Sequence, residues 1–172
     1  NPGRAIRAFN PQILINETYL LSSTLMRAWL EVDLDALGEN YWTIRRKIGA
    51  GVELMAVVKA DAYGHGIDRI VKELDELGVD AFAVISLDEA RRVRRQSAKP
   101  VLIMGYLDAK EIAEAINEDF ILSLYDRGLI VLYERTASRI GKLARVQMKL
   151  ETGLNRLGIG IDEAADVLIG QH

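Results

Sequence analysis

Residues 52–66 read VELMAVVKADAYGHG, an apolar run that ends in a lysine and a loop with two glycines. The run from Leu54 to Val58 is apolar on both faces, which is typical of a strand inside a parallel sheet. Ligands of parallel α/β proteins bind where the carboxyl ends of the strands meet the following loops. Lys59 stands at such an end, so it marks a candidate site.

Lys59 itself allows two interpretations. Its stem could pack on the rim of the core while its ammonium group reaches water. Alternatively, an amine held partly out of water can form a Schiff base with a carbonyl compound or abstract a proton. The following loop favours a ligand, because Tyr63 offers a hydroxyl to a phosphate and Gly64 and Gly66 let the backbone approach one. His65 is a candidate general acid on the same loop.

Further strands are predicted on both sides of this stretch. From residue 54 onward, strand starts recur every 19 to 27 residues, with helical patterns between them, which is the spacing of repeated βα units. A doubly wound sheet and a (β/α)8 barrel both fit. A complete barrel takes about 250 residues, so a TIM-type barrel would be present here only as a partial barrel of about five βα units. The predicted strands are 29–33, 54–59, 81–86, 100–104, 120–123 and 145–150.

Composition limits the possible functions. The chain has 172 residues, is 49% hydrophobic, carries a formal net charge of -3 and contains no cysteine and two histidines. Disulfides and thiolate chemistry are therefore excluded, and we expect no metal site, no nucleic-acid partner and no membrane partner. No apolar run approaches the ~20 residues that span a bilayer, and we expect a cytoplasmic protein. Residues 1–25 are interpreted as an extension or linker, and residues 26–172 as the domain.

Three segments resemble one family. AVVKADAYGHG at 56–66 is similar to the sequence around the cofactor lysine of bacterial alanine racemases, which use pyridoxal 5'-phosphate. KLETGLNRLG at 149–158 resembles a second segment of that family, and WLEVDLDAL at 29–37 resembles its amino-terminal opening. The three segments follow the family's order and cover about residues 26–172. Glu151 departs from the pattern, because the family usually has aspartate there.

The resemblance implies a (β/α)8 barrel, a homodimer when full length, and interconversion of L-alanine and D-alanine for cell-wall synthesis. It implies that Lys59 holds pyridoxal phosphate as a Schiff base and moves the α-proton on the D-alanine side. Tyr63 would bind the cofactor phosphate, and Arg156 would contact the cofactor's phenolic oxygen and the substrate carboxylate. Lys149 matches a lysine that is carbamylated in some members and positions that arginine.

The family's second base, a tyrosine of its carboxyl-terminal domain, has no counterpart among these 172 residues. Its later barrel residues that contact the cofactor are absent as well. We therefore expect a fragment that carries half of a racemase site. The alternatives are a broad-specificity or serine racemase, and a barrel fragment without catalytic function.

Two helix signals and one charged cluster complete the sequence-based expectations. The segment Ser86-Leu-Asp-Glu89 is a capping-box pattern, and Gly78 stands where a carboxyl-terminal cap glycine belongs. The arginines of the next helical pattern are interpreted as a solvated face. They are Arg91, Arg92, Arg94 and Arg95.

Overall fold

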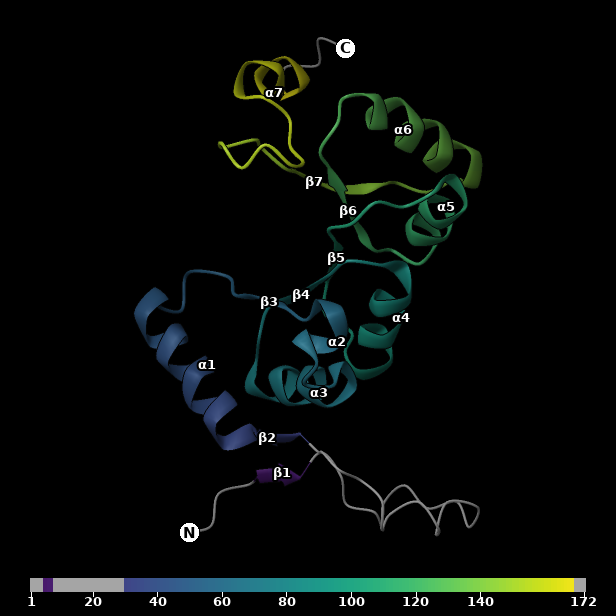
Figure 1. Ribbon diagram of the computed structural model, residues 1–172. Coiled ribbons are helices and arrows are strands. Elements are labelled where there is room, and N and C mark those ends of the chain that lie inside the picture. Colours follow the sequence, from purple (N-terminus) through teal and green to yellow (C-terminus); the bar gives the residue numbers. More distant parts are fainter. Residues whose placement is uncertain (1–4, 8–29, 169–172) are drawn as a thin grey trace, which may run out of the picture.

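The computed structural model describes residues 5–7 and 30–168 and contains one five-stranded parallel sheet with helices along it (Figure 1). The strands of this sheet are β3 (Met55–Val57), β4 (Ala81–Val84), β5 (Val101–Ile103), β6 (Ile121–Leu124) and β7 (Arg145–Met148). The helices are α1 (Leu34–Ile48), α2 (Lys59–Tyr63), α3 (Ile67–Leu77), α4 (Leu87–Gln96), α5 (Ala109–Asn117), α6 (Gly128–Ile140) and α7 (Ile161–Leu168). None of these helices is long and apolar enough to cross a membrane.

Strand order decides between the two predicted folds. The five strands lie side by side in the order in which they follow one another in the chain, and every pairing is parallel. A doubly wound sheet reverses its strand order at one point, and no reversal occurs among these five strands of the described chain. Figure 1 shows α3 to α6 along one side of the sheet. The described residues therefore form a partial (β/α)8 barrel, and the strands predicted from residue 54 onward are confirmed.

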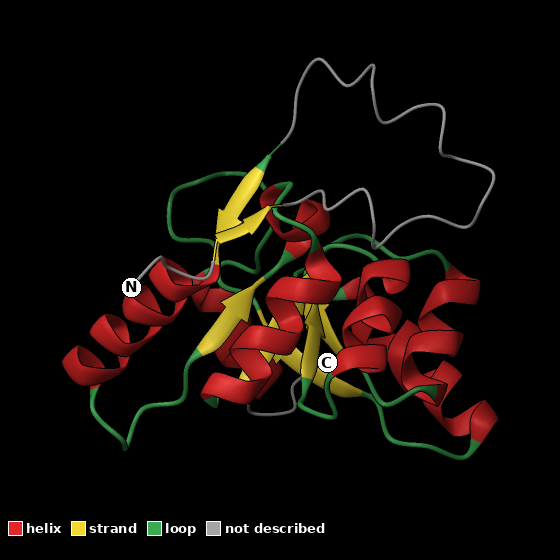
Figure 2. Ribbon diagram, turned by 90° about the horizontal axis from the view of Figure 1, so that it is seen from below, coloured by secondary structure: helices red, strands yellow, loops and turns green. Residues whose placement is uncertain are grey.

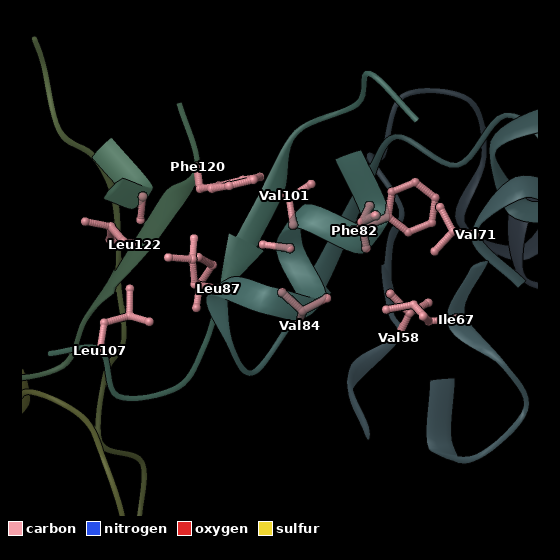
Figure 3. Close-up of a cluster of buried hydrophobic side chains, with 14 of the residues drawn as sticks. Val58, Ile67, Val71, Phe82, Val84, Leu87, Val101, Leu107, Phe120 and Leu122 are labelled. Carbon is pink, nitrogen blue, oxygen red and sulfur yellow. The ribbon is translucent and has the colours of Figure 1, made fainter. Parts of the chain in front are cut away.

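The core lies between this sheet and its helices. Alternate strand residues such as Phe82, Val84 and Ile103 are fully buried and belong to one cluster with helix residues. Figure 3 shows the ring of Phe82 directed toward Val71 of α3, and Val58 beside Ile67. The intervening residues form a row across the opposite face, in the order Val57, Ala83, Leu102, Ile121 and Arg145.

Helix ends follow local rules in most places. Gly78 ends α3 in the left-handed conformation, as predicted, and Asp108 and Glu111 form a reciprocal capping box at α5. At α4 the expected box is only half formed. The Ser86 hydroxyl accepts the N–H of Glu89, but the Glu89 carboxylate binds elsewhere. Glu89 therefore joins other parts of the structure.

A small antiparallel ribbon lies apart from the main sheet (Figure 2). It consists of β1 (Ala5–Arg7) and β2 (Glu31–Asp33), and β2 leads directly into α1, whose first turn is capped by Asp33. β2 lies within the predicted strand 29–33. Most of the predicted extension, residues 1–4 and 8–25, lies outside the described residues.

Candidate active site at the carboxyl ends of the strands

Lys59 stands where the sequence predicts, at the carboxyl end of β3. The preceding Val58 is buried, and its N–H donates to the carbonyl oxygen of Ala83 (2.8 Å), which continues the pairing with β4 past the end of the strand. Lys59 is half-buried. No hydrogen bond or ion pair engages its ammonium group within residues 30–168. The backbone before Lys59 is thus fixed, while no bond within the described residues holds its amine.

The four residues after Lys59 form a left-handed turn. Residues 60–63, which are Ala-Asp-Ala-Tyr, have φ values of 52 to 55°, and α2 is therefore not a right-handed helix. This conformation costs about 1–2 kcal/mol per residue for side chains with a Cβ. Strain of this kind persists only where surrounding contacts fix it, and it concentrates at functional sites.

Backbone bonds close the turn upon itself. The Gly64 N–H donates to Ala60 O (2.9 Å), and the Gly66 N–H donates to Asp61 O (2.9 Å). The ring of His65 also turns inward, because its Nδ1 lies 2.8 Å from Ala62 O. That bond requires the proton on Nδ1 in the neutral ring. His65 therefore supports the loop, and the general-acid role stays a prediction.

Tyr63 is the polar group that the turn presents outward. Tyr63 is 60% exposed, whereas the preceding Ala62 is buried. A pocket of about 450 Å³ opens on the β3 side of the loop, lined by Tyr63, His65, Val57 and Asn40 among others. Lys59 does not line it. This pocket therefore adjoins the tyrosine end of the loop.

Two side chains of α4 hold the turn from outside. The Asp61 N–H donates to Glu89 Oε1 (3.2 Å), and Glu89 Oε2 accepts the N–H of Ile85 (3.1 Å), the residue after β4. Asp61 Oδ1 lies 2.9 Å from Arg92 Nη1 and also accepts the N–H of Ile67 (3.0 Å). Asp61 is therefore bound through both its backbone and its carboxylate.

A second loop with candidate residues follows β7. The Lys149 N–H donates to Leu124 O (2.8 Å), and Lys149 O accepts the N–H of Ile159 (2.8 Å). The chain therefore leaves the sheet after Lys149 and returns beside it ten residues later. A Cβ at Gly158 would lie 2.6 Å from the Glu151 nitrogen, so only glycine fits this return. Lys149 is half-buried, and Arg156 is exposed at the tip of the loop.

Glu151 organises this loop from inside. Its carboxylate accepts the N–H groups of Gly153 (2.6 Å) and Arg156 (3.3 Å). Backbone N–H groups, chiefly those of Asn155 and Gly153, lower the pKa of Glu151, because they stabilise its charged form. The residue that departs from the family pattern therefore makes the contacts that shape the loop.

The candidate residues form two pairs, both at the carboxyl ends of the strands. Lys59 and Tyr63 follow β3, and Lys149 and Arg156 follow β7, so the pairs lie on the two outer strands of the sheet. Four strand spacings of about 4.8 Å separate β3 from β7 along the sheet, roughly 19 Å. No hydrogen bond or ion pair joins the two pairs in the described part of the chain. A ligand that contacts both pairs would have to bridge the concave side of the arc.

The predicted arginine face on α4 lies at the surface but is only partly solvated, because three of its four members have partners. Arg91 binds Glu114 (2.9 Å) and Glu118 (2.5 Å) of the α5 region, Arg92 binds Asp61 and Asp68, and Arg94 stacks over the ring of Phe120. The sequence places Glu89 and Arg92 on a helix but gives no sign that they contact the loop after β3. A capping-box pattern explains a glutamate three residues after a serine without any contact to a distant loop.

Comparisons with known proteins define the family. A family model described as "Alanine racemase, N-terminal domain" matches residues 32–170. Alanine racemase 2 of Caldanaerobacter subterraneus subsp. tengcongensis is 39% identical over 130 residues, which are 75% of this chain and 34% of that protein. The chain spans about a third of the length of the curated relatives it matches.

Solved structures agree on the fold. The alanine racemase of Clostridium difficile 630 superposes with a TM-score of 0.75 at 27% identity, over 80% of this chain and 37% of that one. The histidine racemase of Leuconostoc mesenteroides subsp. sake NBRC 102480 gives 0.72 at 26% identity, over 80% and 37%. Bartonella henselae alanine racemase, described with covalently bound pyridoxal phosphate, gives 0.73 at 23% identity, over 81% and 39%.

The five parallel strands form part of a barrel, and Lys59, which follows β3, is unpaired among the described residues. These features place the chain in the class of TIM-type barrel proteins, whose site lies at the carboxyl ends of the strands. Within that class, the chain belongs to the alanine racemase family and corresponds to its amino-terminal barrel domain.

Proposed function

We propose that this chain supplies the cofactor-binding part of an amino-acid racemase that interconverts L-alanine and D-alanine for cell-wall synthesis. The observation that carries the proposal is the amine of Lys59, half-buried and without a partner among the described residues, at the end of β3 in a member of this family. Localisation in the cytoplasm and assembly of the full-length protein as a homodimer belong to the same proposal.

The groups at the β3 end suit pyridoxal 5'-phosphate. An available amine can bond covalently to an aldehyde, and an exposed phenol can donate to a phosphate. Positions 64 and 66 leave open space where a side chain would otherwise stand. In this assignment Lys59 holds the cofactor and Tyr63 contacts its phosphate. When bound, the cofactor supplies an electron sink that makes the α-hydrogen of an amino acid acidic.

The remaining roles follow from charge. Arg156 would orient the substrate carboxylate and the phenolic oxygen of the cofactor through the N–H groups of its guanidinium. A carbamate on Lys149 would turn it from a repulsive neighbour of Arg156 into an attractive one. Lys59 would move the α-proton on one face, and racemisation needs a second base on the other face.

Reconstitution with pyridoxal phosphate tests the cofactor assignment. Borohydride reduction followed by peptide mass spectrometry should place the adduct on Lys59, and the Lys59→Arg variant should lose it. Lys142→Arg is the matched control, because Lys142 is an exposed lysine that binds a backbone carbonyl far from the proposed site. Equal labelling of the wild type and Lys59→Arg would refute the assignment.

Substrate range is tested with the full-length protein. L-alanine should be converted to D-alanine faster than L-serine or L-histidine is converted to its enantiomer, as measured by chiral chromatography. The structural neighbour described as a histidine racemase favours a second candidate function, a racemase of another amino acid. Preferred turnover of L-histidine or L-serine would establish that alternative.

A further inference from the structure

We infer that Glu89 and Arg92 of α4 are positioning residues that set the geometry of Lys59 and Tyr63 by clamping Asp61. This inference rests on the proposed function, because it assigns the clamp to the same site. Neither side chain has to touch cofactor or substrate. Their proposed task is to keep the left-handed turn, and with it the relative placement of the amine and the phenol, in one conformation.

The first element of the clamp is a doubly accepting carboxylate. Glu89 takes the N–H of Asp61 on Oε1 and the N–H of Ile85 on Oε2. These two donors follow neighbouring strands, β3 and β4, so one carboxylate joins the carboxyl ends of both. Lys59 lies between two fixed points, the Val58 N–H bonded to Ala83 and the Asp61 N–H bonded to Glu89.

The second element is a fork. Arg92 places Nη1 on Asp61 Oδ1 (2.9 Å) and Nη2 on Asp68 Oδ2 (2.6 Å), and so connects the turn to the first turn of α3. Such half-exposed ion pairs stabilise folding little on their own. Their effect here is geometric, because they fix the side chain of a residue whose backbone is in a strained conformation. A lysine could carry the charge but could not span both carboxylates.

Four successive residues with a Cβ in the left-handed region explain why a clamp is needed. Without outside support, the preferred backbone of Ala60, Asp61 and Ala62 is right-handed or extended. Relaxation of any of them would move Lys59 relative to Tyr63, since only three residues separate the two. Displacements of about 1 Å at a reacting group can reduce a rate about a hundredfold.

The chain provides a matched control on the same helix. Arg91 precedes Arg92, has nearly the same side-chain exposure (36% against 34%), and also binds two carboxylates. Its partners Glu114 and Glu118 belong to the α5 region, away from the turn. Loss of the Arg91 contacts should therefore affect stability in a similar way to loss of the Arg92 contacts without altering the site.

The test compares Glu89→Gln, Arg92→Gln and Arg91→Gln in the full-length protein. In Glu89→Gln the single amide oxygen can accept only one of the two N–H groups, and the amide NH₂ would face the other donor. We expect the affinity for pyridoxal phosphate, read from the absorbance of the bound cofactor, to fall at least about tenfold in Glu89→Gln and Arg92→Gln. Arg91→Gln should match the wild type, and Arg92→Lys should recover only part of the loss.

A cofactor-independent measurement separates this inference from the proposed function. Amide hydrogen exchange at Asp61 and the rate of reductive methylation of Lys59 by formaldehyde report on the turn even if the wild type takes up no cofactor. Both should rise in Glu89→Gln and Arg92→Gln and stay unchanged in Arg91→Gln. Equal changes in all three variants, or none in the two clamp variants, would overturn the clamp. Failure of the wild type to bind the cofactor, with these changes present, would overturn only the proposed function.

Discussion

Arg45 on α1 and Asp80, the residue before β4, form an ion pair with 2.5 Å between Nη2 and Oδ2. The same Asp80 oxygen accepts the N–H of Leu54 (2.6 Å), just before β3. One carboxylate thus joins α1, β3 and β4 at the amino ends of the strands, the edge opposite to the candidate site. The first two strands of the sheet are therefore joined at both ends, by Asp80 at their amino ends and by Glu89 at their carboxyl ends.

The Asp80 contacts predict a pH dependence of stability. Arg45 and the Leu54 N–H lower the pKa of Asp80 below its ordinary value of 3.8. The unfolded state therefore binds a proton more readily, so the stabilisation is present above that ordinary value and is lost as the pH falls through the folded pKa. Urea midpoints measured from about pH 6 to about pH 2 should fall less steeply for Asp80→Asn than for the wild type. Asp162→Asn, at an exposed position, should follow the wild type, and parallel curves for all three proteins would contradict the prediction.

Burial of Phe82 predicts a large loss of stability when its side chain is truncated. Its side chain is fully buried between β4 and α3, and Phe82→Ala should lower the free energy of unfolding by about 3–5 kcal/mol. Chemical denaturation with two independent probes measures this loss. Leu143→Ala removes an apolar side chain that is 89% exposed and should change stability very little. Similar effects of the two substitutions would mean that the sheet does not pack as described.

The proposed contact between the Tyr63 hydroxyl and the cofactor phosphate predicts an effect that depends on the phosphate. Removal of the hydroxyl in Tyr63→Phe should weaken binding of pyridoxal phosphate about ten- to a hundredfold, since hydrogen bonds to charged groups contribute about 1.5–3 kcal/mol. Pyridoxal, which has the aldehyde but no phosphate, is the control ligand. Its affinity should be the same for both proteins, as measured by absorbance titration, and an equal loss for both ligands would remove the phosphate role.

The contacts of the Glu151 carboxylate predict that it keeps the loop that carries Arg156 in one conformation. Glu151→Ala should raise the hydrogen-exchange rates of the Gly153 and Arg156 amides, which donate to its carboxylate. The Lys149 amide, bound to Leu124 O, should stay protected and serves as an internal reference. Unchanged exchange at Gly153 and Arg156 would show that the loop keeps its shape without the carboxylate.

The strands could be predicted because their signals are local. The apolar run before Lys59, and the similar runs that follow it, each indicate a buried strand without knowledge of the partners. The choice between a barrel and a doubly wound sheet depends on strand order, which is a long-range property. The family resemblance predicted the barrel, and the sequential order β3 to β7 confirms it.

The backbone of the site could not be predicted in the same way. In Ala60-Asp-Ala-Tyr63 only Asp61 is of a type that occasionally enters the left-handed region, and then as a single residue, so a run of four left-handed residues has no sequence signal. That conformation is fixed by contacts with α4, more than twenty residues later in the chain. The positions of Lys59 and Tyr63 were predictable, but the residues that hold them were not.

The double acceptance by Glu89 also bears on how this site could be moved between proteins. The contiguous motif from Lys59 to Gly66 is the segment a designer would graft onto another barrel. Without Glu89 and Arg92, the grafted segment would lose the partner of the Asp61 N–H and one partner of the Asp61 carboxylate, and it would be free to relax to a right-handed turn. The smallest transferable unit is therefore discontinuous: the loop after one strand together with one face of the helix after the next.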